Sequence, residues 1–440
     1  MRQLKIIEKI RNVRPMANAL AMLWSSAGIA AAFGFLAQAI FARHFSVENY
    51  GLFAAASAAA NMIGPAASFG VGLMWIQKYA SEGWNARKWI KPSLKIAAIG
   101  TLVSTLTYIL WGFTVRGHTE AFFVALYLSP MVAALGAVQL AESRYQLEDR
   151  FYHVATWQFA KQASLFLVAL LSIVFAFDLL TTSASIGIAM AGIATMAFLS
   201  CRALINGTAA IKGHSQPNSA SAPPPKIALL NVINNSWPFA ATGFVYLIFF
   251  QSSIIVLLWL DTPSVAGIYG VSVAMISAVY LLPRILYRKL MMPRMFRWHY
   301  QNPLKLRTFF FQGVFGFALL SIPISVCLAL FAPSLVHLFF GEKYGESAII
   351  FQLFCICVPF RFFSTGAAAM VAEPGHIRVK LAWQSLVALL NILGNVLLIP
   401  GYSIYGAACT TIAVEIIMAT LYFFLVRHLI FTSRAKDSQT

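Results

Sequence analysis

The chain has 440 residues, of which 60% are hydrophobic and only 10% are charged, and its mean hydropathy is +0.75. Because a soluble domain carries about 25% charged residues, this composition excludes an ordinary soluble fold and predicts a polytopic membrane protein. The net charge of +18 would suggest a nucleic-acid partner for a soluble protein. In a membrane protein the same excess is typical of cytoplasmic loops, so we expect no nucleic-acid partner.

The N-terminus combines a basic segment of 17 residues with an apolar run of about 24 residues. Such a run is too long for the apolar region of a cleaved signal peptide, although Ala37-Gln38-Ala39 resembles a cleavage site. The sequence therefore predicts a retained first span.

Twelve segments are long and apolar enough to cross a bilayer, which takes roughly 20 residues. They lie near 18–41, 51–76, 94–115, 121–141, 161–180, 185–205, 229–259, 265–287, 308–332, 347–372, 381–400 and 405–426. The predicted fold class is an all-α membrane protein with about twelve transmembrane helices.

The basic residues predict the orientation. If the N-terminus is cytoplasmic, the cytoplasmic segments hold 28 of the 32 Lys and Arg residues. The outside loops hold only Arg43, Arg116 and Lys343, and Arg361 lies within a span. By the positive-inside rule, we expect a bacterial inner-membrane protein with both termini in the cytoplasm.

The middle of the chain carries a Pro- and Ser-rich stretch that includes Pro223-Pro224-Pro225, which is typical of a flexible linker. It divides the chain into a six-helix lobe over 1–210, a linker over 211–227 and a second six-helix lobe over 228–440. Ser46-Val47 before Tyr50-Gly51 and Ser264-Val265 before Tyr269-Gly270 suggest a parallel repeat, as in transporters. Alternatively, Tyr-Gly is simply frequent in this chain.

Two charged residues fall near the middle of predicted spans, where a charge is expensive and needs a partner or water. Arg361 lies in span ten and Glu415 in span twelve. They could pair with each other as a structural contact. They could also act separately, with Arg361 as an anion ligand and Glu415 as a proton site.

Other polar residues are candidates for binding or coupling. Arg43 and Arg284 lie at span ends, where Arg can bind a substrate or only reach the interface. Asp178, near the outer end of span five, is a second candidate for ion coupling. Gln38, Asn61 and Gln251 are candidate substrate ligands if their helices line a cavity, although such groups also bond neighbouring helices. Lys161 and Glu142 are placed to pair.

No catalytic, nucleotide-binding or metal-binding motif is present. The five cysteines all lie in apolar runs, without the spacing of a metal site or a disulfide framework. We therefore expect a protein that is not an enzyme and needs no cofactor or metal.

Four segments resemble Wzx-type polysaccharide flippases, a family of the multidrug/oligosaccharidyl-lipid/polysaccharide exporter superfamily. They are FARHFSVENYGLF (Phe41–Phe53), LFFGEKY (Leu338–Tyr344), LLNILGNVLLIP (Leu389–Pro400) and YGAACTTIAVE (Tyr405–Glu415). Span eight and the loop after it match less well. The resemblance covers most of the chain, with its motifs in the family's order.

The resemblance implies two six-helix lobes around a central cavity, lined mainly by spans one, two, seven and eight. It implies export of a polyprenyl-pyrophosphate-linked oligosaccharide for exopolysaccharide, capsule or O-antigen (lipopolysaccharide) synthesis, coupled to an ion gradient. Membrane lipids, a polysaccharide polymerase and glycosyltransferases would be its partners. Two alternatives stay open: an ion-coupled multidrug exporter of the same superfamily, and a membrane polysaccharide polymerase or ligase, which the short outside loops disfavour.

Overall fold

A computed structural model describes residues 27–115, 119–209, 211, 227–291, 295, 298, 303–371 and 377–428. Every element in these ranges is a helix. Residues 18–26 of the predicted first span and nearly all of the predicted linker lie outside the described residues.

The first half of the chain forms one bundle of helices. It comprises Ala27–His44, α2 (Val47–Ala67), α3 (Val71–Glu82), η1 (Gly83–Ala86), α4 (Arg87–Phe113), α5 (Thr119–Leu128), α6 (Pro130–Leu147), α7 (Phe151–Val174), α8 (Leu179–Ser200) and α9 (Arg202–Asn206). Pro130 separates α5 from α6 within one predicted span, because proline lacks the N–H that would continue the helix.

The second half forms the other bundle. It comprises α10 (Leu229–Leu260), α11 (Pro263–Arg284), η2 (Ile285–Met291), α13 (Pro303–Thr308), η3 (Phe309–Val314), α14 (Phe315–Leu330), α15 (Ala332–Phe340), η4 (Glu342–Tyr344), α16 (Gly345–Cys355), α17 (Cys357–Met370) and α18 (Ile377–Leu425). The backbone of α18 breaks at Ser403, where φ is 49°, between predicted spans eleven and twelve.

Nine helices in the described part of the chain are long and apolar enough to cross a membrane, or ten if the bent pair α16–α17 is one span. Two of the nine are much longer than one span needs, since Val47–Phe113 has 67 residues and covers α2 to α4, and Val379–His428 has 50 residues and includes the break at Ser403. The chain is thus an all-helical, multi-pass membrane protein, and the number twelve stays a prediction.

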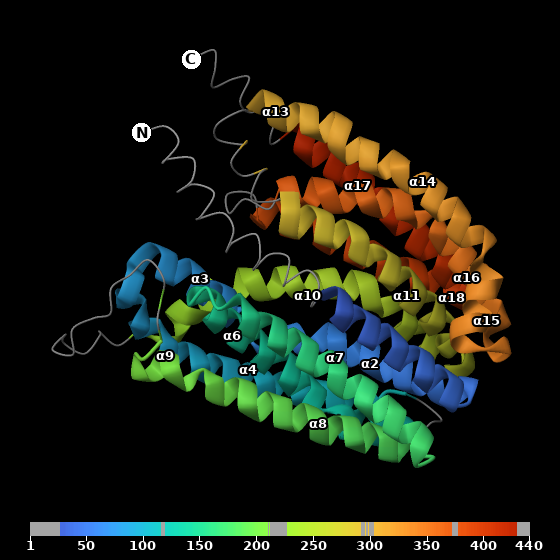
Figure 1. The fold of residues 1–440 in the computed structure, drawn as a ribbon, viewed down its shortest axis with the longest axis horizontal. Coiled ribbons are helices and arrows are strands. Elements are labelled where there is room, and N and C mark those ends of the chain that lie inside the picture. Colours follow the sequence, from blue (N-terminus) through green and yellow to red (C-terminus); the bar gives the residue numbers. More distant parts are fainter. Residues whose placement is uncertain are drawn as a thin grey trace, which may run out of the picture.

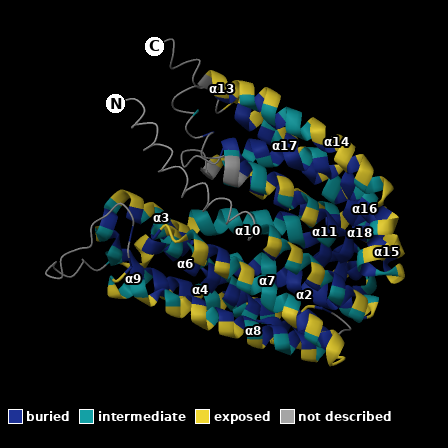
Figure 2. Ribbon diagram, in the orientation of Figure 1, coloured by how far each residue is buried: buried dark blue, intermediate teal, exposed yellow. Residues whose placement is uncertain are grey.

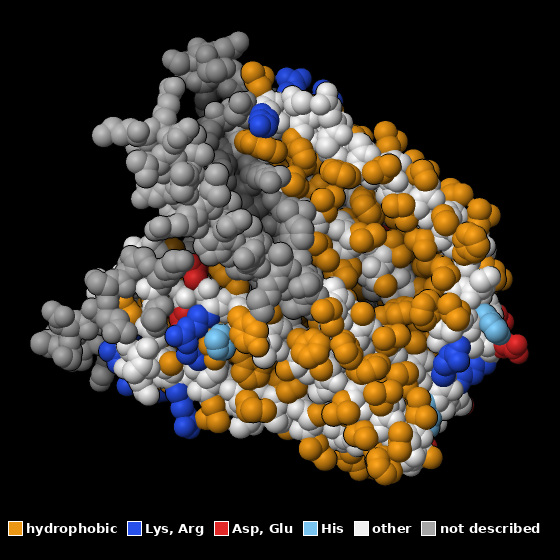
Figure 3. All heavy atoms as spheres, viewed as in Figure 1, with side chains coloured by type: hydrophobic (Ala, Val, Ile, Leu, Met, Phe, Trp, Pro, Cys, Tyr) orange, Lys and Arg blue, Asp and Glu red, His pale blue; other side chains and the backbone are white. Residues whose placement is uncertain are grey.

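The outer surface suits contact with lipid. Buried residues lie between the helices, and large apolar side chains such as Leu110, Ile188, Leu319 and Leu397 are more than 60% exposed on the periphery (Figures 2 and 3). Helices satisfy their own backbone hydrogen bonds, so apolar faces of this kind are stable in hydrocarbon.

The two bundles meet at one end of the molecule and diverge toward the other (Figure 1). At the closed end α2 packs on α10 and α11, and α15 lies beside the end of helix Ala27–His44. The open end carries α3, α9 and α13. α10 belongs to both bundles, because it packs along α18 and also contacts α3 and α4.

Candidate functional site

A cavity of about 540 Å³ lies between the two bundles. Residues of helix Ala27–His44, α2, α5, α6, α7 and α8 line one side, and residues of α10 and α11 line the other. Both halves of the chain therefore contribute to one site.

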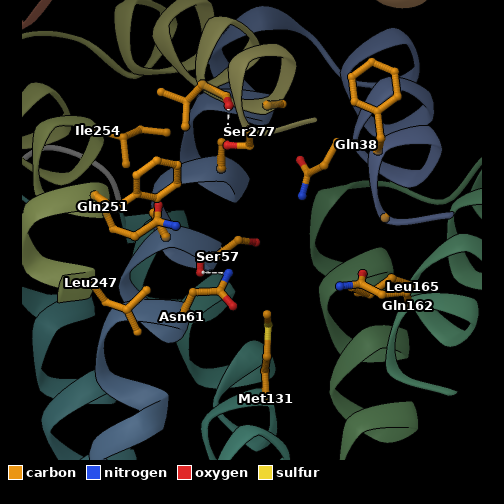
Figure 4. A pocket seen from close by; sticks show the side chains of 18 of the residues that line it. Gln38, Ser57, Asn61, Met131, Gln162, Leu165, Leu247, Gln251, Ile254 and Ser277 are labelled. Atoms are coloured by element: carbon orange, nitrogen blue, oxygen red, sulfur yellow. Dashed lines mark hydrogen bonds between the residues drawn. The ribbon is translucent and has the colours of Figure 1, made fainter. Parts of the chain in front are cut away.

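Four carboxamide side chains lie around this cavity, each from a different helix: Gln38, Asn61, Gln162 and Gln251 (Figure 4). The amide of Asn61 donates to the Ser57 carbonyl at 2.9 Å, and the Gln38 amide oxygen accepts from the Tyr50 hydroxyl at 3.1 Å. Three of the four were candidates from the sequence, and the structure brings these three together.

Gln162 was not singled out from the sequence. Its amide lies against Gly34 of helix Ala27–His44, where an added Cβ would come within 2.7 Å of the amide oxygen. The small residue at position 34 thus lets the Gln162 side chain cross the helix surface beside the cavity. The sequence signal that could have identified Gln162 is its position beside Lys161, as a polar pair near the end of a predicted span.

Two cations line the cavity, Lys161 of α7 and Arg284 of α11. Counting 1.5 Å per residue from the closed end of each helix, Gln38 is about 9 Å deep, Gln251 about 14 Å, Lys161 about 20 Å and Arg284 about 31 Å. The closed end of the cavity is therefore neutral and polar, and positive charge lies toward the open end. Glu142 is close enough to Lys161 to interact with it electrostatically.

Arg361 and Glu415 form a buried ion pair inside the second bundle. One guanidinium nitrogen of Arg361 lies 3.0 Å from a Glu415 carboxylate oxygen, and another donates to the Tyr246 hydroxyl at 2.8 Å. The guanidinium also lies over the Tyr280 ring, 4.7 Å from its centre. Arg361 is 5% exposed and Glu415 1% exposed.

A second, smaller cavity of about 40 Å³ adjoins this pair. Arg361, Arg284, Lys380 and Gln384 contribute to its lining, and Tyr246 and Arg284 line both cavities. Seen from the main cavity, Arg361 therefore lies behind Tyr246, and the Tyr246 side chain separates it from that cavity.

Arg43 and Asp178 lie at the closed end, away from both cavities. Arg43 donates to the carbonyls of His337, Leu338 and Phe339 at 3.2, 2.6 and 2.9 Å. Asp178 caps α8 by accepting from the Thr181 amide at 2.9 Å. Hydrogen bonds from Thr181 hold the pKa of the Asp178 carboxyl below its usual range.

Lys343 was counted only as an outside charge in the sequence, yet it binds across the two bundles. Its ammonium group donates to the carbonyls of Arg43, at 3.0 Å, and Phe45. Partial burial, followed by the neighbouring Arg43 charge, lowers the pKa of Lys343. No sequence pattern could reveal this contact, because it needs the two bundles to be docked.

No family model matches the chain, and no curated relative matches it. The fold is nevertheless similar to that of solved transporters. The lipid II flippase MurJ in an inward closed conformation has a TM-score of 0.69 at 15% identity, over 92% of this chain and 87% of MurJ. An inward-facing multidrug resistance MATE family transporter has a TM-score of 0.67 at 13% identity, over 96% of this chain and 100% of that one.

A transporter of the MOP superfamily from Pyrococcus furiosus is also similar, with a TM-score of 0.57 at 14% identity over 94% of this chain and 95% of that one. These identities are low, and the similarity extends over nearly the whole length in each case. The chain thus shares the fold of the MurJ and MATE transporters.

Proposed function

We propose that this protein is a flippase that moves polyprenyl-pyrophosphate-linked oligosaccharides across the bacterial inner membrane by alternating access. It would serve surface polysaccharide synthesis as a transporter and not as an enzyme. The fold shared with a lipid flippase supports the transport part of the proposal. The Wzx-type motifs of the sequence support the substrate class.

The observation that carries the proposal is the polarity of the main cavity. Burying an unpaired hydroxyl in hydrocarbon costs ~4–8 kcal/mol on an alkane scale, so an oligosaccharide needs a hydrogen-bonding path. Gln38, Asn61, Gln162 and Gln251 offer amide donors and acceptors for sugar hydroxyls. Arg284 can bind phosphate oxygens through a charge-assisted fork.

The positions of these groups along the cavity suggest how the substrate would bind. The polyprenyl tail would stay in the bilayer, the pyrophosphate would lie at the membrane surface, and the substrate would bend there so that the sugars enter the cavity. With the open end facing the cytoplasm, the pyrophosphate would bind near Arg284 and the sugars nearer the neutral closed end. The 28-to-3 distribution of basic residues supports that orientation.

The second candidate is an ion-coupled multidrug exporter, which the similarity to MATE transporters supports equally well as a fold. A pump for organic cations needs negative charge in its cavity. Among the described residues that line the main cavity there is no Asp or Glu, and two lining residues are basic. Glu142 offsets part of the Lys161 charge, so the preference for an anionic cargo rests mainly on Arg284.

A gene deletion tests the proposal. The deletion strain should accumulate undecaprenyl-linked repeat units on the cytoplasmic face and lose surface polysaccharide, and the wild-type gene should restore export. Normal surface polysaccharide in the deletion strain, together with new sensitivity to cationic drugs, would favour the exporter instead. Glycosyltransferase and polymerase genes beside this one would support the polysaccharide pathway and its partners.

A further inference from the structure

At the closed end each bundle caps a helix of the other with a cation. Arg43, at the end of helix Ala27–His44, donates three hydrogen bonds to the last carbonyls of α15. Lys343, which follows α15, donates to the carbonyls of Arg43 and Phe45 at the end of the first helix. The two contacts are reciprocal, so each bundle supplies one cation and one helix C-terminus.

Helix C-termini suit such contacts because their last carbonyls have no partner within the helix and carry the negative end of the helix dipole. The Tyr344 hydroxyl adds a hydrogen bond to the Ala42 carbonyl at 3.1 Å. Glu342, in the same turn as Lys343, lies 3.3 Å from His337. The hydrogen bonds that Arg43 and Lys343 make across the two bundles thus all go to neutral carbonyl oxygens.

Opening the closed end separates the two bundles and breaks these contacts. Arg43 and Lys343, which already lie close enough to repel each other, then lose the carbonyls that compensate for their charge. A phosphate oxygen is a stronger acceptor for a cation than a neutral carbonyl is. An anion that reaches the closed end therefore stabilises the open form by replacing the lost hydrogen bonds.

We propose that Arg43 and Lys343 form a release site for a diphosphate-class anion, built into the gate that closes this end of the cavity. With the gate shut, the two cations bind helix carbonyls; with the gate open, they bind the anionic group of the departing substrate. This inference rests on the proposed function, because it assigns the anion to the cargo. It makes opening of the gate depend on the presence of the cargo.

Spin-label distance measurements on the full-length protein test this proposal. Labels are placed at Phe175→Cys and Tyr402→Cys, which are exposed at the closed end of the two bundles, after replacement of the exposed Cys327 and Cys409 by alanine. Inorganic diphosphate in Mg²⁺-free buffer should increase the population with the longer distance. Sodium chloride at the same ionic strength should not.

The Arg43→Gln/Lys343→Gln variant should populate the longer distance without diphosphate and lose the response to it. Arg43→Lys should retain part of the response. Lys95→Gln is the matched control, because it removes one charge from the exposed surface of α4 and should respond like the wild type. A wild type that ignores diphosphate, or a double variant that responds fully, would overturn the proposal.

This readout is separate from transport. If the deletion strain blocks polysaccharide export but diphosphate leaves the distances unchanged, only the release site fails. If the distances respond but export is normal in the deletion strain, the proposed function fails and the anion site stands.

Discussion

Arg361 and Glu415 illustrate how this protein holds charge inside a membrane. Each is almost fully buried, and the guanidinium is satisfied by Glu415, by Tyr246 and by surrounding aromatic rings. Removing one member of a buried pair is strongly destabilising, because the other charge stays buried without a partner. Both residues join α17 and α18 to α10, so the pair also fixes the packing of the second bundle.

We expect Arg361→Ala to lower the free energy of unfolding by about 3–5 kcal/mol. The double variant Arg361→Met/Glu415→Leu should lose less than the two single variants combined, since no charge is left uncompensated. Thermal unfolding in detergent measures both effects. Export should be preserved better by Arg361→Lys than by Arg361→Ala; equal, wild-type export from both would remove Arg361 from the list of substrate ligands.

Asp178 has two possible roles, capping α8 and coupling transport to an ion, and the two can be tested separately. Its carboxylate caps α8, and its lowered pKa means that the ionised form stabilises the folded state. That contribution is present above the unfolded pKa of about 3.9 and disappears as the pH falls through the lower folded value.

Asp178→Ala should therefore cost about 1 kcal/mol at neutral pH, while Asp178→Asn keeps a good cap and should be nearly neutral. In thermal unfolding between pH 7 and pH 3, the wild type should lose more stability than the Asn variant as the pH falls below about 4. If Asp178→Asn abolishes transport while the protein stays stable, the carboxylate has a coupling role beyond the cap.

At the scale of helices, the closed end depends on a crossing in which two backbones touch. Gly51 of α2 lies against Pro263 and Gly267 of α11, and a Cβ added at Gly51 would come within 1.7 Å of the Pro263 carbonyl oxygen. Only a glycine allows this approach. Both helices begin here, α2 after its cap Ser46 and α11 after its cap Thr262.

Gly51→Ala should push the two helices apart and raise the population in which the closed end is open. The spin-label distances described above would detect the change. Gly192→Ala is the matched control, because Gly192 also lies within a helix but has no atom within 4 Å of its added Cβ. Equal behaviour of the two variants would show that the crossing does not hold the gate shut.

These elements also show what a sequence can and cannot predict here. Hydrophobic length predicted apolar segments that coincide with helices in the described part of the chain. The break at Pro130, inside the predicted span 121–141, was not predicted, and a proline alone does not identify a break, because Pro65 and Pro238 lie inside continuous helices. The depth of Arg361 and Glu415 raised their pairing as one of two hypotheses. The Lys343 contact and the Gly51 crossing were not predictable, since a transmembrane helix that is apolar all round does not reveal which face meets a neighbour.

At the scale of the whole molecule, the proposed cargo depends on the sign of the charge in the cavity. Both bundles line the site, and its described lining holds amides, hydroxyls, Lys161 and Arg284. In a site partly shielded from water, a single added charge interacts strongly with the charges of the cargo. The proposed preference for an anionic cargo therefore depends on the absence of carboxylates from this described lining.

Asn61→Asp changes that sign locally with almost no change of shape. We expect it to slow transfer of a polyprenyl-pyrophosphate oligosaccharide in proteoliposomes at least tenfold, equivalent to about 1.4 kcal/mol, because the carboxylate repels the pyrophosphate and competes for Arg284. It should also allow measurable efflux of a cationic dye. Asn234→Asp, on the exposed surface of α10 outside the cavity, is the control and should leave both rates unchanged. Unaltered oligosaccharide transfer by Asn61→Asp would mean that the cargo does not pass through this cavity.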